Sequence, residues 1–311
     1  PACTTMLRAI LVSLQLFAAA ASAPAGLYSV DTSNLVRWTN GAPETVGPLY
    51  PFSGVQGAQK TAIVPENQLL YALAMTTAGS QTLLYGFSLA NASTAVQVVT
   101  PISQTGKYVG QGQTIHYAGD GKLVITGVDL QSKKHTAWSV DTSQTPHNFT
   151  VLSDGFLQTD PAVLDNAHTY DSAHGVFWTE DKMNLIGIDV ANGTEVARNP
   201  EGAEWPHAME YDATSNTLLG WAISANAPEA IQIDTTTFKT SRRGGIDPSF
   251  SPKSFWNGLS AFDESTRSIY GMCSNADGAD LLITYSASTG QTSAVVMKGA
   301  RPMNFAYYNP L

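Results

Sequence analysis

Residues 170–198 read YDSAHGVFWTEDKMNLIGIDVANGTEVAR and contain the pattern that decides the fold. The aromatic-aspartate pair Tyr170-Asp171 is followed by a polar turn and the apolar run Val176-Phe177-Trp178. A second alternating run, residues 185–189, leads to a tight turn at Ala191-Asn192-Gly193 and a last short strand. Alternation with period two, broken by Gly and Asn, is typical of antiparallel strands joined by hairpins. This stretch therefore predicts a unit of four short strands.

The same unit recurs along the chain. The aromatic-aspartate pair returns as Tyr211-Asp212 and Phe262-Asp263, and the alternating run returns with its last residue at 31, 88, 141, 189, 234 and 286. Four strands in roughly 45–50 residues are the sequence signature of a β-propeller blade. We expect five complete blades, at about residues 61–100, 113–154, 166–200, 207–244 and 258–298.

The two ends of the repeat region are expected to share a closing blade. Residues 27–39 are interpreted as a third and an outer strand, and residues 302–311 as an inner strand from Asn304 to Tyr308. Such pairing closes the ring and removes exposed sheet edges. The sequence therefore predicts an all-β, six-bladed propeller with a split closing blade. One strand is missing from this count, so either the closing blade has three strands or the chain is truncated, and truncation would allow seven blades.

The repeat resembles the broad superfamily of YVTN, NHL and quinoprotein-type propellers. The resemblance covers residues 27–311 and depends on the repeated aromatic-aspartate turns and the strand-Asp-x-x-Thr-Gly turns. It implies radial blades around a central channel with a binding face, and it implies no particular activity.

Composition limits the classes of partner. Of 311 residues, 43% are hydrophobic, which is enough for a substantial core, and only 13% are charged. The net charge of −9 argues against binding nucleic acid or anionic lipid, because both require a basic surface. Two cysteines exclude a disulfide framework and a cysteine-based metal site.

The N-terminus is expected to direct secretion. Residues 6–23 combine a short basic start, an apolar run and the small residues Ala21-Ser22-Ala23, which is the pattern of a signal peptide. The alternative is a buried or membrane-anchoring N-terminal helix. We expect one propeller domain over residues 24–311, with no membrane insertion of the mature chain. Three sequons, at Asn91, Asn148 and Asn192, fall in segments predicted to lie on the outer rim and predict a glycoprotein.

A ligand site is expected where loops lead into the inner strands, because a concavity forms where repeats meet. Amide, aromatic and basic side chains gather in these segments and suit a glycan or a peptide, by stacking and directional hydrogen bonds. The alternative for the two tryptophans is packing between blades. The candidate ligand-binding residues are Gln113, Asn166, Trp205, His207, Trp256, Asn257, Arg301 and Asn304.

An axial metal ion is a second hypothesis for the channel. His116, His168 and His207 lie on or just before three consecutive inner strands, and Asp165 could add a ligand or act as a base. Counting with period two places His116 on the opposite face from the other two, so a site would use His168, His207 and Asp165. The recurring aspartates after the inner strands are interpreted as turn-fixing residues instead.

The sequence thus favours a secreted, glycosylated propeller that binds an extracellular protein or glycan through one axial face and needs no cofactor. The alternatives are a secreted propeller enzyme with an axial metal, acting as a hydrolase, lyase or oxidoreductase, and a structural module of an extracellular coat or matrix. The catalytic motifs of α/β-hydrolases, zinc proteases, phosphate-binding loops and dinucleotide-binding folds are absent from the sequence.

Overall fold

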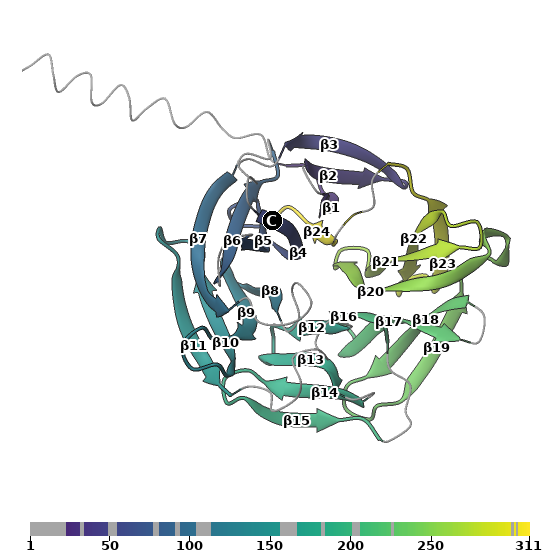
Figure 1. The fold of residues 1–311 in the computed structure, drawn as a ribbon. Helices are drawn as coiled ribbons and strands as arrows, with labels where there is room; N and C mark the ends of the chain where they lie inside the picture. Colours follow the sequence, from purple (N-terminus) through teal and green to yellow (C-terminus); the bar gives the residue numbers. More distant parts are fainter. Residues whose placement is uncertain are drawn as a thin grey trace, which may run out of the picture.

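The chain forms a ring of six radial, four-stranded antiparallel sheets, so the predicted six-bladed propeller is confirmed (Figure 1). Because six sheets already close the ring, the alternative of seven blades is excluded. The computed structural model describes residues 23–31, 34–48, 55–76, 81–90, 94–103, 113–155, 167–181, 184–200, 206–224, 227–299, 302 and 304–311. Most of the predicted signal peptide therefore lies outside the described residues.

Five blades are continuous in sequence, and each runs from an innermost strand to an outermost strand. The first comprises β4 (Val55–Val64), β5 (Leu69–Thr76), β6 (Gln81–Ser88) and β7 (Thr94–Ser103). The second comprises β8 (Thr114–Gly119), β9 (Lys122–Val128), β10 (His135–Asp141) and β11 (Asn148–Asp154). The third comprises β12 (His168–Asp171), β13 (Val176–Asp181), β14 (Asn184–Asp189) and β15 (Thr194–Arg198).

The remaining continuous blades follow the same order. The fourth comprises β16 (Ala208–Asp212), β17 (Thr217–Ser224), β18 (Ala227–Asp234) and β19 (Thr240–Gly245). A short 3₁₀ turn, η3 (Pro248–Phe250), then leads to the fifth blade. The fifth comprises β20 (Pro252–Asp263), β21 (Ser268–Asn275), β22 (Asp280–Ser286) and β23 (Gln291–Val296).

The closing blade contains four strands, which corrects the expected number. Its order from the axis outward is β24 (Ala306–Tyr308), β1 (Gly26–Val30), β2 (Asn34–Thr39) and β3 (Ala42–Pro48). Residues 27–30 are therefore the second strand and not the third. The alternating pattern is the same for either position, and only the pairing of Tyr28 with Ala306 decides between them. No strand is missing from the closing blade.

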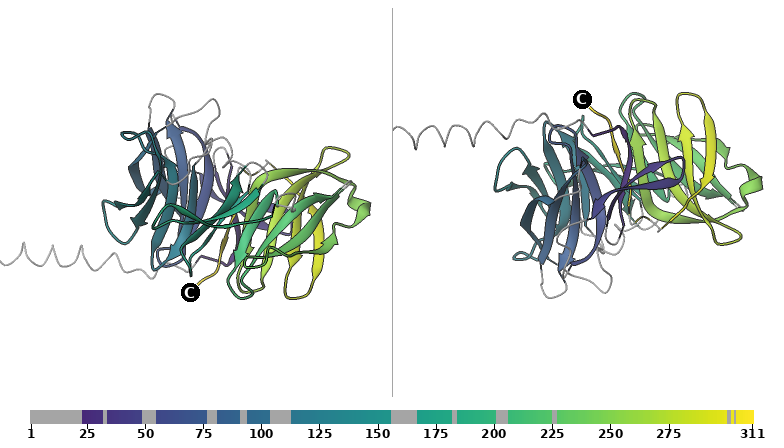
Figure 2. Two further views of the ribbon diagram at one scale, coloured as in Figure 1. Left: turned by 90° about the horizontal axis from the view of Figure 1, so that it is seen from below. Right: turned by 90° about the horizontal axis from the view of Figure 1, so that it is seen from above.

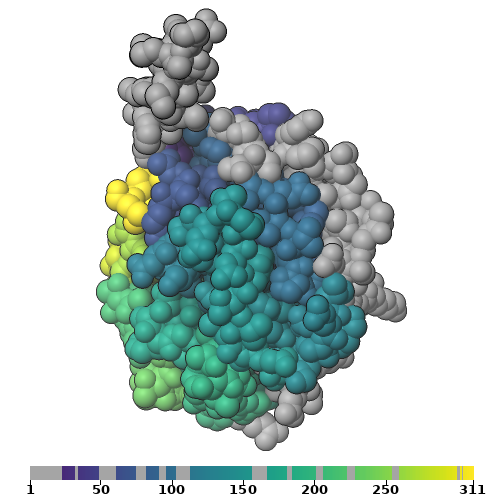
Figure 3. Space-filling view, turned by 90° about the vertical axis from the view of Figure 1, so that its left-hand side faces the viewer, coloured from purple at the N-terminus to yellow at the C-terminus, as the bar shows by residue number. Residues whose placement is uncertain are grey.

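The hydrophobic core lies mainly between neighbouring blades. One cluster joins Tyr71 and Leu73 of the first blade to Ile115 and Trp138 of the second. Trp138 and Trp221 are almost completely buried, as the alternating strand pattern requires. Each blade face therefore depends on its neighbour for burial. Figure 3 shows this neighbour packing at the rim, where successive blades lie side by side from blue to green.

Aspartates fix the turns after the inner strands and also link the blades. Asp212 accepts hydrogen bonds from the Thr214 amide (3.1 Å) and the Ser215 hydroxyl (2.6 Å) of its own turn. The Arg267 side chain of the next blade also donates to Asp212, through Nε at 3.0 Å and Nη2 at 2.5 Å. Asn309, just beyond β24, donates to Asp263 in the same way at 3.2 Å. These contacts hold the inner edges of adjacent blades together.

The two ends of the channel differ in construction. We call the end with these short turns the turn face, and the end where the chain leads into the inner strands the loop face. Figure 2 shows the strands running through the thickness of the ring between the two faces, with the C-terminal segment leaving on one of them. Within the described ranges, the chain forms no helix with the length and apolar character needed to cross a bilayer.

Candidate functional site

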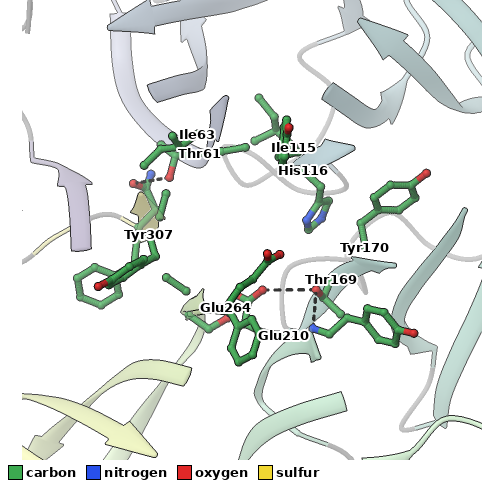
Figure 4. A pocket seen from close by; sticks show the side chains of 18 of the residues that line it. Thr61, Ile63, Ile115, His116, Thr169, Tyr170, Glu210, Glu264 and Tyr307 are labelled. Carbon is green, nitrogen blue, oxygen red and sulfur yellow. Dashed lines mark hydrogen bonds between the residues drawn. The ribbon is translucent and has the colours of Figure 1, made fainter. Parts of the chain in front are cut away.

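A cavity of about 240 Å³ occupies the centre of the ring (Figure 4). All six blades contribute to it, through β4, β8, β12, β16 and β20, through the turns after β4 and β20, and through β24 with its flanking residues. The lining extends from Thr61 and Asn304 near the loop face to Pro65 and Asn309 at the turn face. Thr61 donates a hydrogen bond to the side-chain oxygen of Asn304 at 3.1 Å, which ties β4 to the segment before β24.

Aromatic side chains line the cavity near the turn face. We call Tyr117, Tyr170, Tyr211 and Phe262 the aromatic collar. Each stands near the end of the inner strand of its blade, just ahead of the polar turn, so the repeat places the four rings at one level. All four are half-buried, which means that the rings pack against the blades and still face the cavity. The collar therefore offers aromatic surface to a group that enters from the turn face.

Glu210 is the acidic group deepest in the cavity. Its carboxylate accepts hydrogen bonds from the Ser260 hydroxyl at 2.8 Å and from the Thr169 hydroxyl at 3.4 Å. Thr169 in turn accepts from the Tyr211 amide at 3.2 Å, so strands of three blades orient this group. Burial raises the pKa of Glu210 to about 7, and the two hydroxyl hydrogen bonds oppose this only in part. Protein surrounds Glu210, and its side chain keeps contact with the water space of the cavity.

A second carboxylate, Glu264, stands at the turn-face opening. Glu264 directly follows Asp263, is exposed and lines the cavity, as Figure 4 shows. Its negative charge acts electrostatically on Tyr117 of the second blade. The pKa of Tyr117 is raised, first by burial, then by its hydrogen bond and proximity to Glu66, and also by the charges of Asp120 and Glu264. Among the described lining residues there is no lysine or arginine.

Two histidines meet in the wall of the cavity. His116 Nε2 and His168 Nδ1 are 3.0 Å apart, and both rings contact Phe177 behind them. The count with period two excluded His116 from a common site with His168, and this exclusion is wrong. Adjacent blades face each other with opposite sides of their strands, so side chains of opposite parity meet at the boundary. His207 is half-buried outside this lining, and its amide donates to the carbonyl of Trp221 at 2.8 Å.

The metal hypothesis gains no cluster from these positions. Within the described ranges, no three His, Cys, Asp or Glu side chains gather as metal ligands would. Asp165 lies outside those ranges. His168 Nδ1 lies 3.0 Å from His116 Nε2.

The ligand-binding residues predicted at the loop face are only partly described. Asn304 lines the cavity, whereas the buried Gln113 donates to the Thr82 hydroxyl at 2.9 Å in the first blade. Trp256 and Asn257 belong to β20, but their side chains are not among those described. Asn166, Trp205 and Arg301 lie outside the described residues. Of the sequons, Asn148 and Asn192 are exposed on outer segments, and Asn91 lies outside the description.

Sequence reasoning missed the collar and both glutamates. It used the recurring aromatic residues as markers of turns and did not ask which way they face. A signal for Glu210 was present in the alignment of the inner strands. By register it occupies the level held by Thr169 and Ala261 in neighbouring blades, so a carboxylate replaces a small side chain there.

The six sheets around a central cavity define the fold as a β-propeller. TolB from Acinetobacter baumannii is similar over 95% of this chain and 69% of its own, with 12% identity and a TM-score of 0.61. Nidogen in a nidogen/laminin complex is similar over 91% of this chain and 98% of the matched chain, with 12% identity and a TM-score of 0.56. A putative TolB from Agrobacterium tumefaciens is similar over 91% of this chain and 97% of its own, with 10% identity and a TM-score of 0.54. At these identities the similarity establishes the fold alone. No protein-family model and no curated protein matches the sequence.

Proposed function

We propose that this chain is a secreted glycoprotein that binds a protein partner through the turn face of its propeller. The observation that carries the proposal is the cavity, which reaches this face at the exposed Glu264 and is lined by the collar and two carboxylates. Half-buried aromatic rings are enriched in protein-binding surfaces because they provide a large contact area with little loss of side-chain entropy.

The preference for a protein over a glycan has two supports. The cavity, at about 240 Å³, lies below the 300–1,000 Å³ typical of drug-sized ligand pockets, so it suits one inserted side chain better than an oligosaccharide. In addition, one of the similar propellers comes from a complex of nidogen with laminin. A large axial face around a small cavity is consistent with docking of a folded partner.

Secretion and glycosylation remain part of the proposal. Asn148 begins the outermost strand β11 and Asn192 lies in the turn before the outermost strand β15. Both are exposed, so a glycosyltransferase can reach them. After secretion from a eukaryotic host, we expect Asn148→Gln and Asn192→Gln each to remove one glycan from the intact mass. Masses equal to that of the unmodified chain in all forms would contradict glycosylation.

The binding face can be tested with an engineered glycan. Ala213→Asn creates a sequon at an exposed turn-face position, because Thr214 and Ser215 already supply the two residues that must follow the asparagine. The secreted chain would be screened against arrays of extracellular proteins and of glycans. We expect a protein partner whose binding is lost in Ala213→Asn and kept in Asn192→Gln, which removes a rim sequon.

The predicted loop-face residues provide the opposing variant. Combined replacement of Trp205, Trp256 and Asn257 by alanine changes three residues that the sequence predicts at that face. Loss of binding in this variant, with binding retained in Ala213→Asn, would overturn the choice of the turn face. Binding to glycans and to no protein would overturn the class of partner.

A further inference from the structure

The cavity carries negative charge without a positive counterpart among the described residues. Glu210 and Glu264 contribute carboxyl groups from two blades, and neither forms an ion pair with a described residue. The chain as a whole carries a net charge of −9, so its electrostatic field attracts cations toward such an opening. A buried carboxylate without a countercharge is costly, and an incoming cation relieves that cost.

The aromatic collar lies between the two carboxylates along the channel. Glu264 is at the turn-face opening, the collar follows, and Glu210 stands one strand position deeper than Tyr211. Aromatic rings within about 6 Å attract ammonium and guanidinium groups through their negative faces. A group that enters from the turn face therefore meets a charge, a ring of aromatic surface and then a second charge.

The carboxylate of Glu210 can accept further hydrogen bonds beside the two that it already accepts. Ser260 and Thr169 each donate one hydrogen bond to this carboxylate, to different oxygens. A carboxylate has about four acceptor positions, so donors on an inserted group can fill the remaining ones. Ammonium has three N–H donors and guanidinium has five, and neither brings an acceptor that would compete with the two hydroxyls.

We infer that the cavity receives the cationic side chain of a lysine or arginine carried by the protein partner. The partner as the source of this group rests on the proposed function, whereas the preference for a cation does not. The opening beside the exposed Glu264 lets the chain behind the charged head continue onto the turn face. A cavity of about 240 Å³ accommodates one such side chain.

Cation binding at this site must depend on pH. The raised pKa of Glu210, about 7, means that about one tenth is ionised at pH 6 and about nine tenths at pH 8. Because apparent affinity scales with the fraction in the binding-competent state, it should rise about tenfold between these values. Among the described lining residues, the other ionisable groups are His116, His168, Glu264 and the phenols of Tyr117, Tyr170, Tyr211 and Tyr307. Protonated histidines would repel a cation at low pH, so they act in the same direction.

The test uses small probes and the full secreted chain. Binding of n-butylammonium and of its neutral analogue 1-butanol would be titrated by saturation-transfer NMR at pH 6 and pH 8. We expect n-butylammonium to bind more tightly at pH 8 than at pH 6. At pH 8, we expect 1-butanol to bind at least about tenfold more weakly than n-butylammonium. Equal binding of the two probes, or tighter cation binding at pH 6, would overturn the inference.

Variants locate the binding group. Glu210→Gln keeps the size of the side chain and removes its charge, and we expect it to weaken n-butylammonium binding at pH 8 by about tenfold or more. The matched control is Glu195→Gln on outer strand β15, where the carboxylate pairs with Arg198 at the surface, and this change should leave binding unaltered. Equal effects of the two substitutions would overturn the assignment. Unchanged circular dichroism would show that Glu210→Gln still folds.

Peptide probes distinguish the source of the cation. We expect Ac-Gly-Lys-Gly-NH₂ to bind at least as tightly as n-butylammonium, and the corresponding glutamine peptide to bind much more weakly. Binding of n-butylammonium without the lysine peptide would overturn the partner side chain as the source. The protein arrays test the proposed function separately, because failure of the probes concerns the cavity alone and a lack of partners concerns the function alone.

Discussion

Replacing Arg267 with alanine should destabilise the ring more than the loss of any exposed ion pair. Arg267 belongs to the fifth blade and donates to Asp212 of the fourth at 3.0 and 2.5 Å. Asp212 is 1% exposed, so removal of the guanidinium leaves a buried carboxylate without its countercharge. Breaking such a pair costs about 3–5 kcal/mol. We expect about 3 kcal/mol, because the Thr214 amide and the Ser215 hydroxyl still donate to Asp212.

The assay is equilibrium unfolding in urea, with Arg198→Ala as the matched control. Arg198 forms its pair with Glu195 at the surface, with side chains 39% and 41% exposed, and such pairs contribute about 0–1 kcal/mol. The backbone φ of Arg267 is 53°, but alanine and arginine are similarly strained there, so the comparison reports the side chain. In an Asp212→Asn background the same replacement should cost much less. A loss for Arg267→Ala no larger than that for Arg198→Ala would refute the reasoning.

Three further predictions concern buried groups. Tyr308→Ala should cost about 3–5 kcal/mol of unfolding free energy, because this side chain is 1% exposed and its ring meets Tyr28 edge-on across the closing blade. Val296→Ala, at a position 48% exposed, should change that free energy by less than about 0.5 kcal/mol, and equal urea midpoints for the two variants would contradict the prediction. The pKa of Glu210 rises from 4.5 to about 7 on folding, so the native state binds the proton more tightly, and its contribution to stability is lost as the pH rises through 7. Glu210→Gln should therefore raise the free energy of unfolding at pH 8 by about 1–2 kcal/mol, a value reduced for screening by cavity water, and leave it nearly unchanged at pH 4. Melting curves at both pH values measure this difference, and equal shifts of the melting temperature at the two pH values would contradict it. Burial raises the pKa of the Cys273 thiol to about 12, with a further contribution from the charge of Asp280. A thiol-reactive disulfide reagent at pH 8 should therefore modify Cys273 only after unfolding. The variant Cys273→Ser identifies the share of the signal that comes from this thiol, and rapid reaction of the native protein would contradict the prediction.

The blades were predictable from the sequence because each repeats the same local signals. Alternation fixes which residues of a strand are buried, and turns such as that after Asp171 fix where one strand ends and the next begins. These signals are local, so the boundaries of the five continuous blades could be predicted closely. The position of residues 27–30 could not, since it depends on pairing with β24 at the other end of the repeat region.

The site was less predictable because it depends on contacts between blades. The repeat pattern gives the parity of a side chain within its own strand, whereas the meeting of His116 with His168 depends on how two blades face each other. Glu210 differs from the repeat rather than following it, so a search for recurring motifs passes over it. The sequence segments before the inner strands follow no periodic pattern, so sequence reasoning could only predict that their side chains lie near the axis.

The pairing of β1 with β24 also sets an order of events during synthesis. Tyr28 and Ala306 pair although they lie 278 positions apart in the sequence. At roughly 5–20 residues per second, a ribosome needs roughly 15–55 s to add the residues between them. For that interval β1 has no inner partner, and the first and fifth blades have no finished closing blade between them. The nascent ring is therefore an open arc with unpaired strand edge and apolar faces at its two ends, which is when a chaperone would have most surface to bind.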